Sequence, residues 1–324
     1  MLKLNEMVGN NSSVNGDQIV KLSLNPTSMW FLVIFCSIEI LIGSIANFVV
    51  IVIISVSRQL RERSEDRLIL NLAITDFVCL TTLLPWHIYL LTQLQIDITG
   101  TSFIGYITLK VLLIITAANT ILSLAVDRFA AVVFPLRHYR IIDTRIMTVF
   151  SWGVGVGFAA TWQLLLLKYQ AVVTVVYGAL LLAMSLILYS IIFYHTLKQG
   201  RKILNQRRSI HAARENFSSH LLMKITLRTF VVMCLFYVTY LPMVIYASHF
   251  SLILGREWAK LWNVRIWIYS FMYSNSCINP FIYGLRTNRF RKEFHKKIWS
   301  RGFRRHLMEV RVRPVHPLFP EAFQ

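Results

Sequence analysis

Long runs of apolar residues alternate with short polar and basic segments along most of the chain. Runs that reach the roughly 20 residues needed to cross a membrane predict transmembrane helices. The connections between them are short and contain no internal repeat, and the longest is the basic segment from about 198 to 220. The pattern predicts an all-α membrane protein built as a seven-transmembrane helix bundle. The predicted spans are approximately 28–56, 67–92, 103–133, 145–166, 170–197, 221–249 and 262–285.

The charge of the loops predicts how this bundle is oriented. The chain of 324 residues is 56% hydrophobic with a net charge of +19, and its lysines and arginines gather in alternate connections. Because basic residues next to spans stay on the cytoplasmic side, we predict the N-terminus outside and the C-terminus inside. We expect a multi-pass protein of the plasma membrane, in contact with the lipid bilayer and with no nucleic acid. The outer side keeps only Lys3, Lys21, Lys168, Arg256, Lys260 and Arg265.

The two ends of the chain differ in character. In the polar N-terminal tail we expect no cleavable signal peptide. Its Asn10 and Asn11 lie in N-x-S sequons that would be glycosylated outside the cell. After the last span, Phe290, Phe294 and Ile298 share one face of a helix with basic residues opposite, which suits an anionic inner leaflet. The predicted division is an extracellular tail (1–27), the bundle (28–285), an amphipathic membrane-surface helix (286–299) and a cytoplasmic tail (300–324).

Polar side chains recur inside the apolar runs, where hydrocarbon makes them costly, and this marks them as functional candidates. They form short motifs that follow one another in order, one set per predicted helix. The motifs are "GSIAN" at 43–47, "NLAITD" at 71–76, "DRF" at 127–129, Trp152, Tyr189, "FYVTYLP" at 236–242 and "NSCINPFIY" at 275–283. This set resembles the rhodopsin-like (class A) G-protein-coupled receptors, and the resemblance extends from about residue 28 to 299.

The resemblance implies a receptor that couples an extracellular ligand to nucleotide exchange on a heterotrimeric G protein, and not an enzyme. Arg128 would pair with its neighbour Asp127 at rest and meet the G protein when the sixth helix swings outward. Prolines remove backbone donors and kink helices, which suits a rearrangement between two states. The residues matched to this switch are Asp127, Arg128, Tyr189, Pro242, Pro280 and Tyr283.

The same resemblance implies an internal polar site around Asp76. One carboxylate with amide and hydroxyl oxygens suits a small hard cation such as sodium. Ala117 stands where the family often supplies a hydroxyl, so a protonated or water-bridged Asp76 is the alternative. Asn71 and Trp152 match a structural pair between the second and fourth helices. The residues matched to the sodium site are Asp76, Asn275, Ser276 and Asn279.

Three features depart from most members of the family. Phe103 stands where a cysteine usually links the third helix to the second outer loop, and no cysteine lies between Cys79 and Cys234, so that disulfide cannot form. Only residues 168–170 are available as a turn between the fourth and fifth runs. Leu181 replaces the usual proline of the fifth helix. Together these departures resemble the melanocortin receptors, and in part the lysophospholipid and cannabinoid receptors.

Lys110 lies inside the third run, at the depth where amine receptors of the family hold an aspartate, which argues against a cationic amine as the ligand. Two interpretations stay open. Lys110 either pairs with Glu39 or extends its long stem to the outer interface, or it is the counter-ion of an acidic, partly lipophilic small molecule. The predicted pocket is apolar and aromatic around one cation, and it comprises Lys110, Trp86, His87, Val111, Ile114, Tyr240, Met243, Tyr269 and Tyr273.

The function predicted from these residues is therefore a G-protein-coupled receptor for an acidic or lipid-like ligand. The alternatives are a receptor of the same fold for a peptide or another chemical signal, and a membrane transporter, which the lack of inverted repeats disfavours. An opsin would need a lysine in the seventh helix for a Schiff base, and Tyr273 occupies that place.

Two expectations concern regulation at the inner side. Leu222 stands near the place of the acid that locks the sixth helix to Arg128 in some members, so we expect basal signalling. Beyond Ser300 the tail has no serine or threonine, and we therefore expect weak arrestin binding. The remaining inner hydroxyls, which arrestin binding would then depend on, include Ser209, Ser218 and Ser219.

Overall fold

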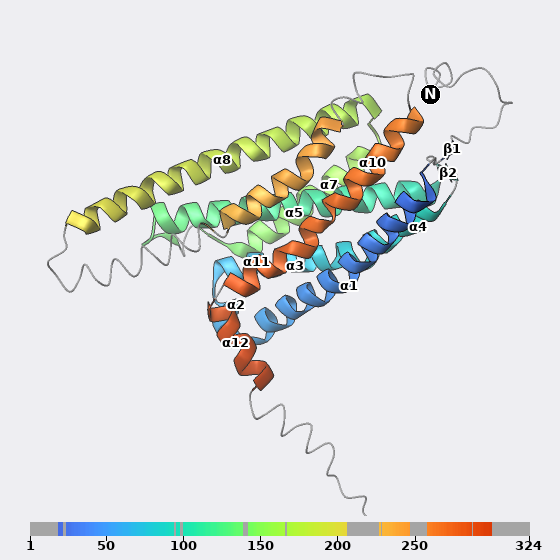
Figure 1. Cartoon of the computed structure of the whole chain (residues 1–324). Coiled ribbons are helices and arrows are strands. Elements are labelled where there is room, and N and C mark those ends of the chain that lie inside the picture. Colours follow the sequence, from blue (N-terminus) through green and yellow to red (C-terminus); the bar gives the residue numbers. More distant parts are fainter. Residues whose placement is uncertain are drawn as a thin grey trace, which may run out of the picture.

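Helices make up nearly all of the chain that the structure, a computed structural model, describes (Figure 1). We name the end of the bundle that carries the two short strands the outer end, and the opposite end the inner end, after the predicted orientation. The sequons at Asn10 and Asn11 and the serines Ser209, Ser218 and Ser219 lie outside the described residues. The described residues are 19–21, 24–93, 95–97, 100–138, 142–165, 167–205, 227, 229–246, 258–286 and 288–299.

Each predicted apolar run contains a helix, displaced by a few residues at its ends. The first five runs correspond to α1 (Pro26–Val56), then α3 (Ser64–Val78) continued by the π-helix η1 (Cys79–Leu83) and α4 (Leu84–Thr92), then α5 (Thr101–Val133), α7 (Thr144–Trp162) and α8 (Leu167–Asn205). The sixth run holds the helix Thr229–Tyr246. The rest are α10 (Trp258–Met272) and α11 (Ser274–Arg286) in the seventh run, with the short α2 (Arg58–Arg61) and the terminal α12 (Asn288–Trp299).

Length and apolarity separate these helices into two groups. Within the described residues, 5 helices are long and apolar enough to cross a membrane, namely Pro26–Val56, Ser64–Thr92, Thr101–Val133, Val175–Lys198 and Thr229–Tyr246. The fourth and seventh runs form helices that fall short of this measure. The seventh is interrupted by a turn at Tyr273, which divides it into pieces of 15 and 13 residues.

Local sequence explains where helices begin and where the second one is distorted. The side chain of Asn25 accepts a hydrogen bond of 3.1 Å from the Thr27 amide, and Pro26 follows as the first helical residue, which is a favourable start for α1. Pro85 near the start of α4 cannot donate a backbone hydrogen bond, and the π-helix η1 lies immediately before it. Such bulges often accompany functional positions, and α4 continues from this one toward the outer end.

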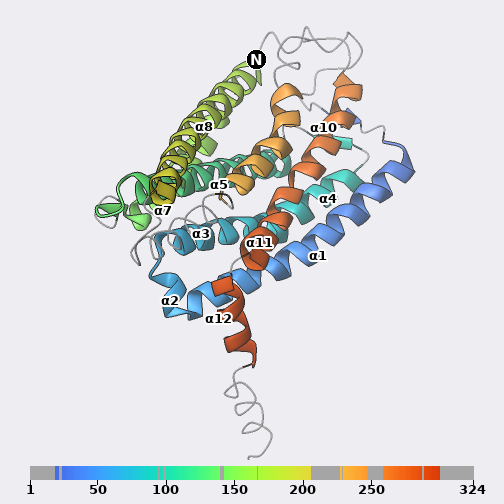
Figure 2. The same ribbon diagram turned by 60° about the vertical axis from the view of Figure 1, so that its left-hand side comes forward.

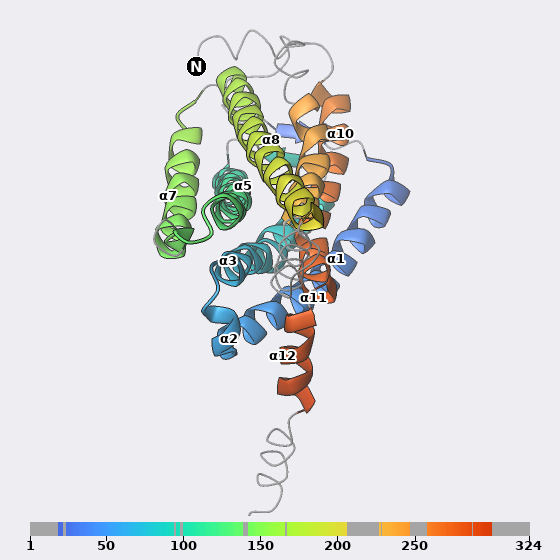
Figure 3. The same cartoon turned by 90° about the vertical axis from the view of Figure 1, so that its left-hand side faces the viewer.

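The helix α5 lies at the centre of the bundle, packed against α3, α7 and α8. Figure 3 shows α5 between α7 and α3, and Figure 2 shows α4 between α10 and α1 in the outer half of the bundle. Gly155 lets α7 approach α5 closely, because a Cβ there would lie 2.3 Å from Thr116 Oγ1. The predicted fold class, a bundle of apolar helices followed by a short eighth helix, is confirmed.

The predicted pair of Asn71 and Trp152 is also confirmed. Trp152 Nε1 donates to Asn71 Oδ1 at 2.9 Å, and Asn71 Nδ2 donates to Thr120 Oγ1 at 2.8 Å. The amide of α3 thus joins α7 to α5. Buried polar groups stabilise a fold only when they are paired, and in hydrocarbon few alternative partners exist.

Replacing Trp152 by phenylalanine should lower the stability of the bundle. The substitution removes the indole donor and leaves Asn71 Oδ1 without it, at a cost of about 1–3 kcal/mol for a buried group that loses its partner. Thermal unfolding of the solubilised protein measures this loss. The matched control is Trp30→Phe on the exposed face of α1, where the side chain is 58% exposed. Equal melting temperatures for both variants would contradict the structural role of the pair.

A strand pair at the outer end was not predicted. The strand β1 (Ile19–Lys21) lies in the N-terminal tail and runs antiparallel to β2 (Gln95–Asp97) of the loop between α4 and α5. Ile19 pairs with Asp97 and Lys21 pairs with Gln95. The tail is therefore held against the first outer loop by backbone hydrogen bonds, in a chain whose four cysteines are free thiols.

The terminal helix α12 lies within the segment 286–299, which was predicted to form an amphipathic helix on the membrane surface. Phe290 and Phe294 stack with their ring centroids 6.5 Å apart. On the other side, Glu293 Oε2 accepts a hydrogen bond of 2.8 Å from the hydroxyl of Ser57, which directly follows α1. The helix is thus anchored to the inner end of the bundle by one polar contact, and its aromatic face packs against the core.

Candidate functional site

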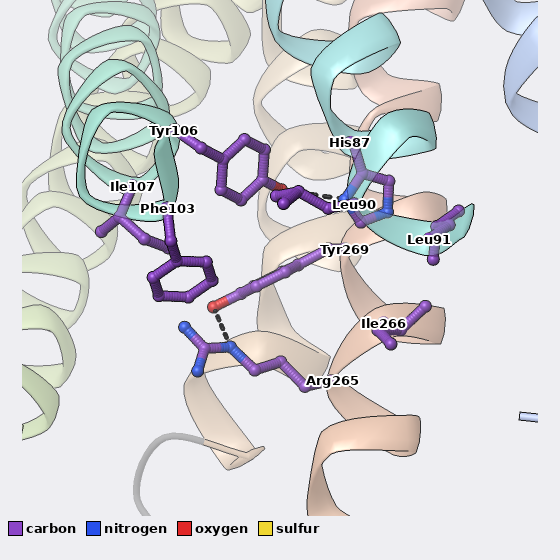
Figure 4. A pocket seen from close by; sticks show the side chains of 9 residues that line it. All are labelled: His87, Leu90, Leu91, Phe103, Tyr106, Ile107, Arg265, Ile266 and Tyr269. Carbon is purple, nitrogen blue, oxygen red and sulfur yellow. Dashed lines mark hydrogen bonds between the residues drawn. The ribbon is translucent and has the colours of Figure 1, made fainter. Parts of the chain in front are cut away.

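A pocket opens at the outer end between α4, α5 and α10 (Figure 4). It encloses about 340 Å³ of empty space, part of which is open to solvent. Apolar and aromatic side chains form most of its wall, and a single arginine stands among them. Such a lining, with a few polar groups, is typical of small-molecule sites. The lining residues are His87, Leu90, Leu91, Phe103, Tyr106, Ile107, Arg265, Ile266 and Tyr269.

Lys110 lies on α5 one helical turn below Tyr106 and is only 2% exposed. Its Nζ lies 3.6 Å from the centroid of the Tyr269 ring and 5.3 Å from that of Tyr106. Within the described ranges, Nζ has no hydrogen-bond partner. The aromatic faces attract the ammonium group, but they do not replace the hydrogen bonds that it loses on leaving water.

Neither structural alternative predicted for Lys110 is found. The side chain does not reach the outer interface, because it is almost fully buried. Glu39 does not pair with it either, since among the described residues no ion pair joins the two. Glu39 is itself buried on α1, where Oε1 accepts a hydrogen bond from the Ser274 hydroxyl and Oε2 has no partner in the described part of the chain. The expected counter-charge of Lys110 is thus not Glu39.

Arg265 adds a second cation to the same aromatic ring. Its Nε donates to the Tyr269 hydroxyl at 2.9 Å, and its Cζ lies 5.1 Å from the ring centroid. Figure 4 shows the guanidinium group at the hydroxyl end of Tyr269, facing Phe103. From the sequence, Arg265 was predicted only to be one of the basic residues on the outer side. Its spacing of one helical turn from Tyr269, a predicted pocket residue, was the signal that could have revealed it.

A chain of hydrogen bonds orders the aromatic side of the pocket. His87 Nδ1 and the Tyr106 hydroxyl are 2.9 Å apart, and His87 Nε2 and Ser270 Oγ are 3.1 Å apart. The Tyr106 hydroxyl also shares a hydrogen bond of 2.8 Å with the Tyr273 hydroxyl. These contacts join α4, α5 and α10, and they end at Tyr273, where the seventh run is interrupted. Hydrogen bonds thereby connect the pocket wall to the turn at Tyr273 that divides the seventh run.

Of the nine predicted pocket residues, His87 and Tyr269 line this pocket, whereas Lys110 is not among its lining residues. Most of the others belong to the apolar cluster around Tyr106. Val111 is the exception, because it packs toward α7 with Ala159 and Ile115. The pocket lies nearer the outer end than predicted. Lining residues such as Leu90 and Phe103 were therefore not predicted. Predicting them would have required knowing how deep each helix lies in the bundle. The predicted residues that share one cluster with Tyr106 are Trp86, Ile114, Tyr240, Met243, Tyr269 and Tyr273.

The internal polar site is assembled around Asp76, which is 1% exposed. Asn279 Nδ2 donates to Asp76 Oδ2 at 2.9 Å, and Asn47 Nδ2 donates to the carbonyl oxygen of Ser276 at 2.9 Å. The amide oxygens of Asn47, Asn275 and Asn279 have no partner in the part of the chain described. Buried oxygens of this kind fit a small hard cation or water molecules, so the residues present are compatible with sodium.

At the inner end, Arg128 contacts two acids and not one. It binds the neighbouring Asp127 through Nε at 3.0 Å and through Nη2. Its Nη1 also lies 3.4 Å from Oε2 of Glu65 on α3. His138 in the following segment holds the other oxygen of Asp127, with Nε2 and Oδ1 at 3.0 Å. From the sequence, a second acid for Arg128 was expected only near the sixth helix, where Leu222 stands instead, and Leu222 lies outside the described residues.

Glu65 should restrain basal signalling, because its contact holds Arg128 in the resting arrangement. Replacing it by glutamine removes one charge partner, and a change of about 1 kcal/mol shifts a two-state population roughly fivefold. Ligand-free second-messenger production at matched surface expression should rise accordingly. Glu62→Gln, which alters an exposed pair with Arg58, serves as the control. A basal level of Glu65→Gln at or below that of the unmodified protein would contradict this role.

The other residues matched to the switch lie on α8, on the helix Thr229–Tyr246 and on α11. Tyr189 on α8 is 1% exposed and meets Phe230 edge-on, with ring centroids 5.2 Å apart. Pro280 is inside α11, and Pro242 lies within the helix Thr229–Tyr246. Tyr283 belongs to α11, but its side chain is outside the described set.

Comparison with known proteins agrees with the motifs. A family model described as 7 transmembrane receptor (rhodopsin family) matches residues 46–172 and 158–283. Among curated proteins, the chain is 24% identical over 302 residues to galanin receptor 2b of Danio rerio, which covers 86% of this chain and 76% of the relative. It is 27% identical to trace amine-associated receptor 4 of Mus musculus, over 88% of this chain and 91% of the relative. It is 26% identical to galanin receptor type 1 of Rattus norvegicus, over 78% of this chain and 77% of the relative.

Proposed function

Because the chain belongs to the rhodopsin family of seven-transmembrane receptors, we propose that it is a receptor for an acidic small molecule, with Lys110 as the counter-ion of the ligand. Membership of this family makes it a multi-pass membrane protein that transmits signals to a G protein and is not an enzyme. The observation that carries the ligand class is the Lys110 ammonium group, buried against Tyr269 without a hydrogen-bond partner in the described chain.

Electrostatics favours an anion at this place. Burying an ammonium group away from water costs several kcal/mol unless an opposite charge or hydrogen bonds compensate it. A carboxylate or phosphate entering the pocket would supply both. A cationic amine would instead meet two like charges, Lys110 and Arg265, in a site of low dielectric. The name of one relative refers to trace amines, but this pair of cations opposes that ligand class here.

A peptide is the second candidate ligand, because the names of two relatives refer to galanin receptors. At 24% and 26% identity this likeness suggests a broad group and not a ligand. A peptide with an acidic side chain or a free carboxyl end would still use Lys110. The melanocortin, lysophospholipid and cannabinoid receptors are a further proposed likeness, which rests on the departures at Phe103, Leu181 and residues 168–170.

The proposed topology follows the charges of the loops. The N-terminus would be outside the plasma membrane, with Asn10 and Asn11 glycosylated, and the tail from 300 to 324 would be inside. We also propose sodium or water beside Asp76, basal signalling, and weak arrestin recruitment that depends on the third inner segment. The support for each is the residue pattern and, for Asp76, the unpaired amide oxygens around it.

A signalling screen with matched compounds tests the proposal. Each carboxylic acid or phosphate would be applied beside its neutral amide or ester and beside the amine of the same skeleton, and short peptides would complete the panel. Second-messenger production in transfected cells should respond to acids and not to their neutral or cationic partners. Activation by amines, or equal potency of acids and their amides, would contradict the proposal.

A further inference from the structure

Two cations from different helices share the ring of Tyr269. Lys110 of α5 lies over the face of the ring at 3.6 Å from the centroid, and Arg265 of α10 binds the hydroxyl at 2.9 Å. Like charges this close repel each other strongly where water is excluded. One aromatic ring offsets part of that cost through cation–π attraction. The arrangement therefore gains stability from each negative charge that enters it.

The shape of the pocket limits the ligand as well as its charge. The roughly 340 Å³ of empty space in the pocket includes open solvent, so the volume that the side chains enclose is smaller than the roughly 300–1,000 Å³ of a typical ligand pocket. The pocket wall includes the aliphatic side chains of Leu90, Leu91, Ile107 and Ile266. The apolar part of the ligand must therefore be short. A compact molecule fits this space better than one with a long acyl chain.

We propose that the ligand is a compact dianion, with one negative charge held by Lys110 at the face of the Tyr269 ring and the other by Arg265 at its hydroxyl end. This inference deepens the proposed function and rests on it. A small dicarboxylate and a phosphate monoester supply the same chemistry, two negative charges on a short body. The guanidinium group suits a planar carboxylate or a phosphate through paired N–H donors, and the ammonium group acts as a point charge.

The position of Arg265 suits it to bind the second negative charge of the ligand. Arg265 lines the pocket, whereas Lys110 is not a lining residue and is buried one helical turn beyond Tyr106 on α5. A monoanion bound to Lys110 leaves the guanidinium without an anionic partner from the ligand. A dianion would contact both cations, and the distance between its two charges must match the distance from the ammonium group to the guanidinium group. Arg265 should therefore determine selectivity, while Lys110 should determine whether any anion binds.

The test compares dianions with the matched monoanions. The probes are aliphatic dicarboxylates of increasing length with their half-amides, and phenyl phosphate with its methyl ester. Potency is measured by second-messenger production, and binding is measured by the shift in melting temperature of the solubilised receptor. The receptor should prefer at least one dianion over its monoanion by about tenfold or more. The dicarboxylate and phosphate arms identify which source of charge fits.

Variants assign the preference to its residue. Arg265→Gln should reduce the preference to about twofold or less while monoanions keep their potency, and Lys110→Gln should abolish both responses. Lys21→Gln, which removes an outer charge on β1, should change neither. Equal potency of dianions and monoanions, or an equal loss for both in Arg265→Gln, would overturn the dianion inference and leave the anionic receptor intact. If no anion of either class activates or stabilises the receptor, both fail.

Discussion

Replacing Lys110 by glutamine is expected to weaken the response to acidic ligands by about a hundredfold or more. The ammonium group is buried against Tyr269, and no described hydrogen-bond partner competes for it. Truncating one partner of a buried, hydrogen-bonded charge pair costs about 2–5 kcal/mol in binding, and each 1.4 kcal/mol is about tenfold. Glutamine keeps much of the side-chain length but carries no charge, so concentration–response curves measure the charge contribution.

Two variants separate this effect from damage to the fold. Lys110→Arg keeps the charge and should retain a measurable part of the response. Glu39→Gln removes the other buried charge of the outer half without touching the proposed pocket, so it should leave the potency of acids unchanged. Surface expression is compared for all three. Unchanged potency in Lys110→Gln would return Lys110 to a purely structural role and remove the anionic ligand from the account.

Replacing Arg128 by alanine is expected to abolish G-protein activation while ligand binding persists. Arg128 is the central charge of the inner cluster, held by Asp127 and Glu65. In the resemblance to the family, this arginine meets the G protein after the sixth helix moves. Without it, the moved helices would lack their main cationic contact. Nucleotide exchange should therefore fall to the level of cells without the receptor, whereas ligand-induced thermal stabilisation should be retained.

The control for Arg128 is an arginine with no role in the cluster. Arg137 is exposed in the segment after α5, and Arg137→Ala should retain at least most of the signalling. Because Arg128→Ala also leaves two carboxylates without their cation, Arg128→Gln provides a second, more conservative variant that should lose signalling as well. Full signalling in both Arg128 variants at normal expression would exclude the proposed switch.

The apolar runs were sufficient to predict the helices, because hydrocarbon admits few other backbone structures. Motif residues were also placed correctly where one helix contacts another by a specific hydrogen bond, as for Asn71 with Trp152. The pairing of the N-terminal tail with the first outer loop was not predictable in the same way. It depends on a strand of 3 residues, Ile19–Lys21, which carries no periodic signal of useful length.

The pocket shows why charged contacts are harder to predict than helices. Lys110 and Tyr269 were expected to lie near each other, but Arg265 was not expected beside them. A charged residue near the end of a predicted helix is assigned to the loop as long as the depth of that helix is unknown. Glu65 was missed for a related reason. Its contact with Arg128 depends on how α3 and α5 pack at the inner end, and no local pattern in either segment contains that information.

The most direct test of the account is nucleotide exchange on a G protein by the purified receptor in lipid particles, with and without an acidic ligand from the screen. The account predicts that the acid accelerates exchange for the unmodified receptor, that Lys110→Gln needs about a hundredfold more ligand, and that Arg128→Ala gives no acceleration at any concentration. Acceleration by the acid that is unaffected by Lys110→Gln, or activation only by amines, would contradict the account.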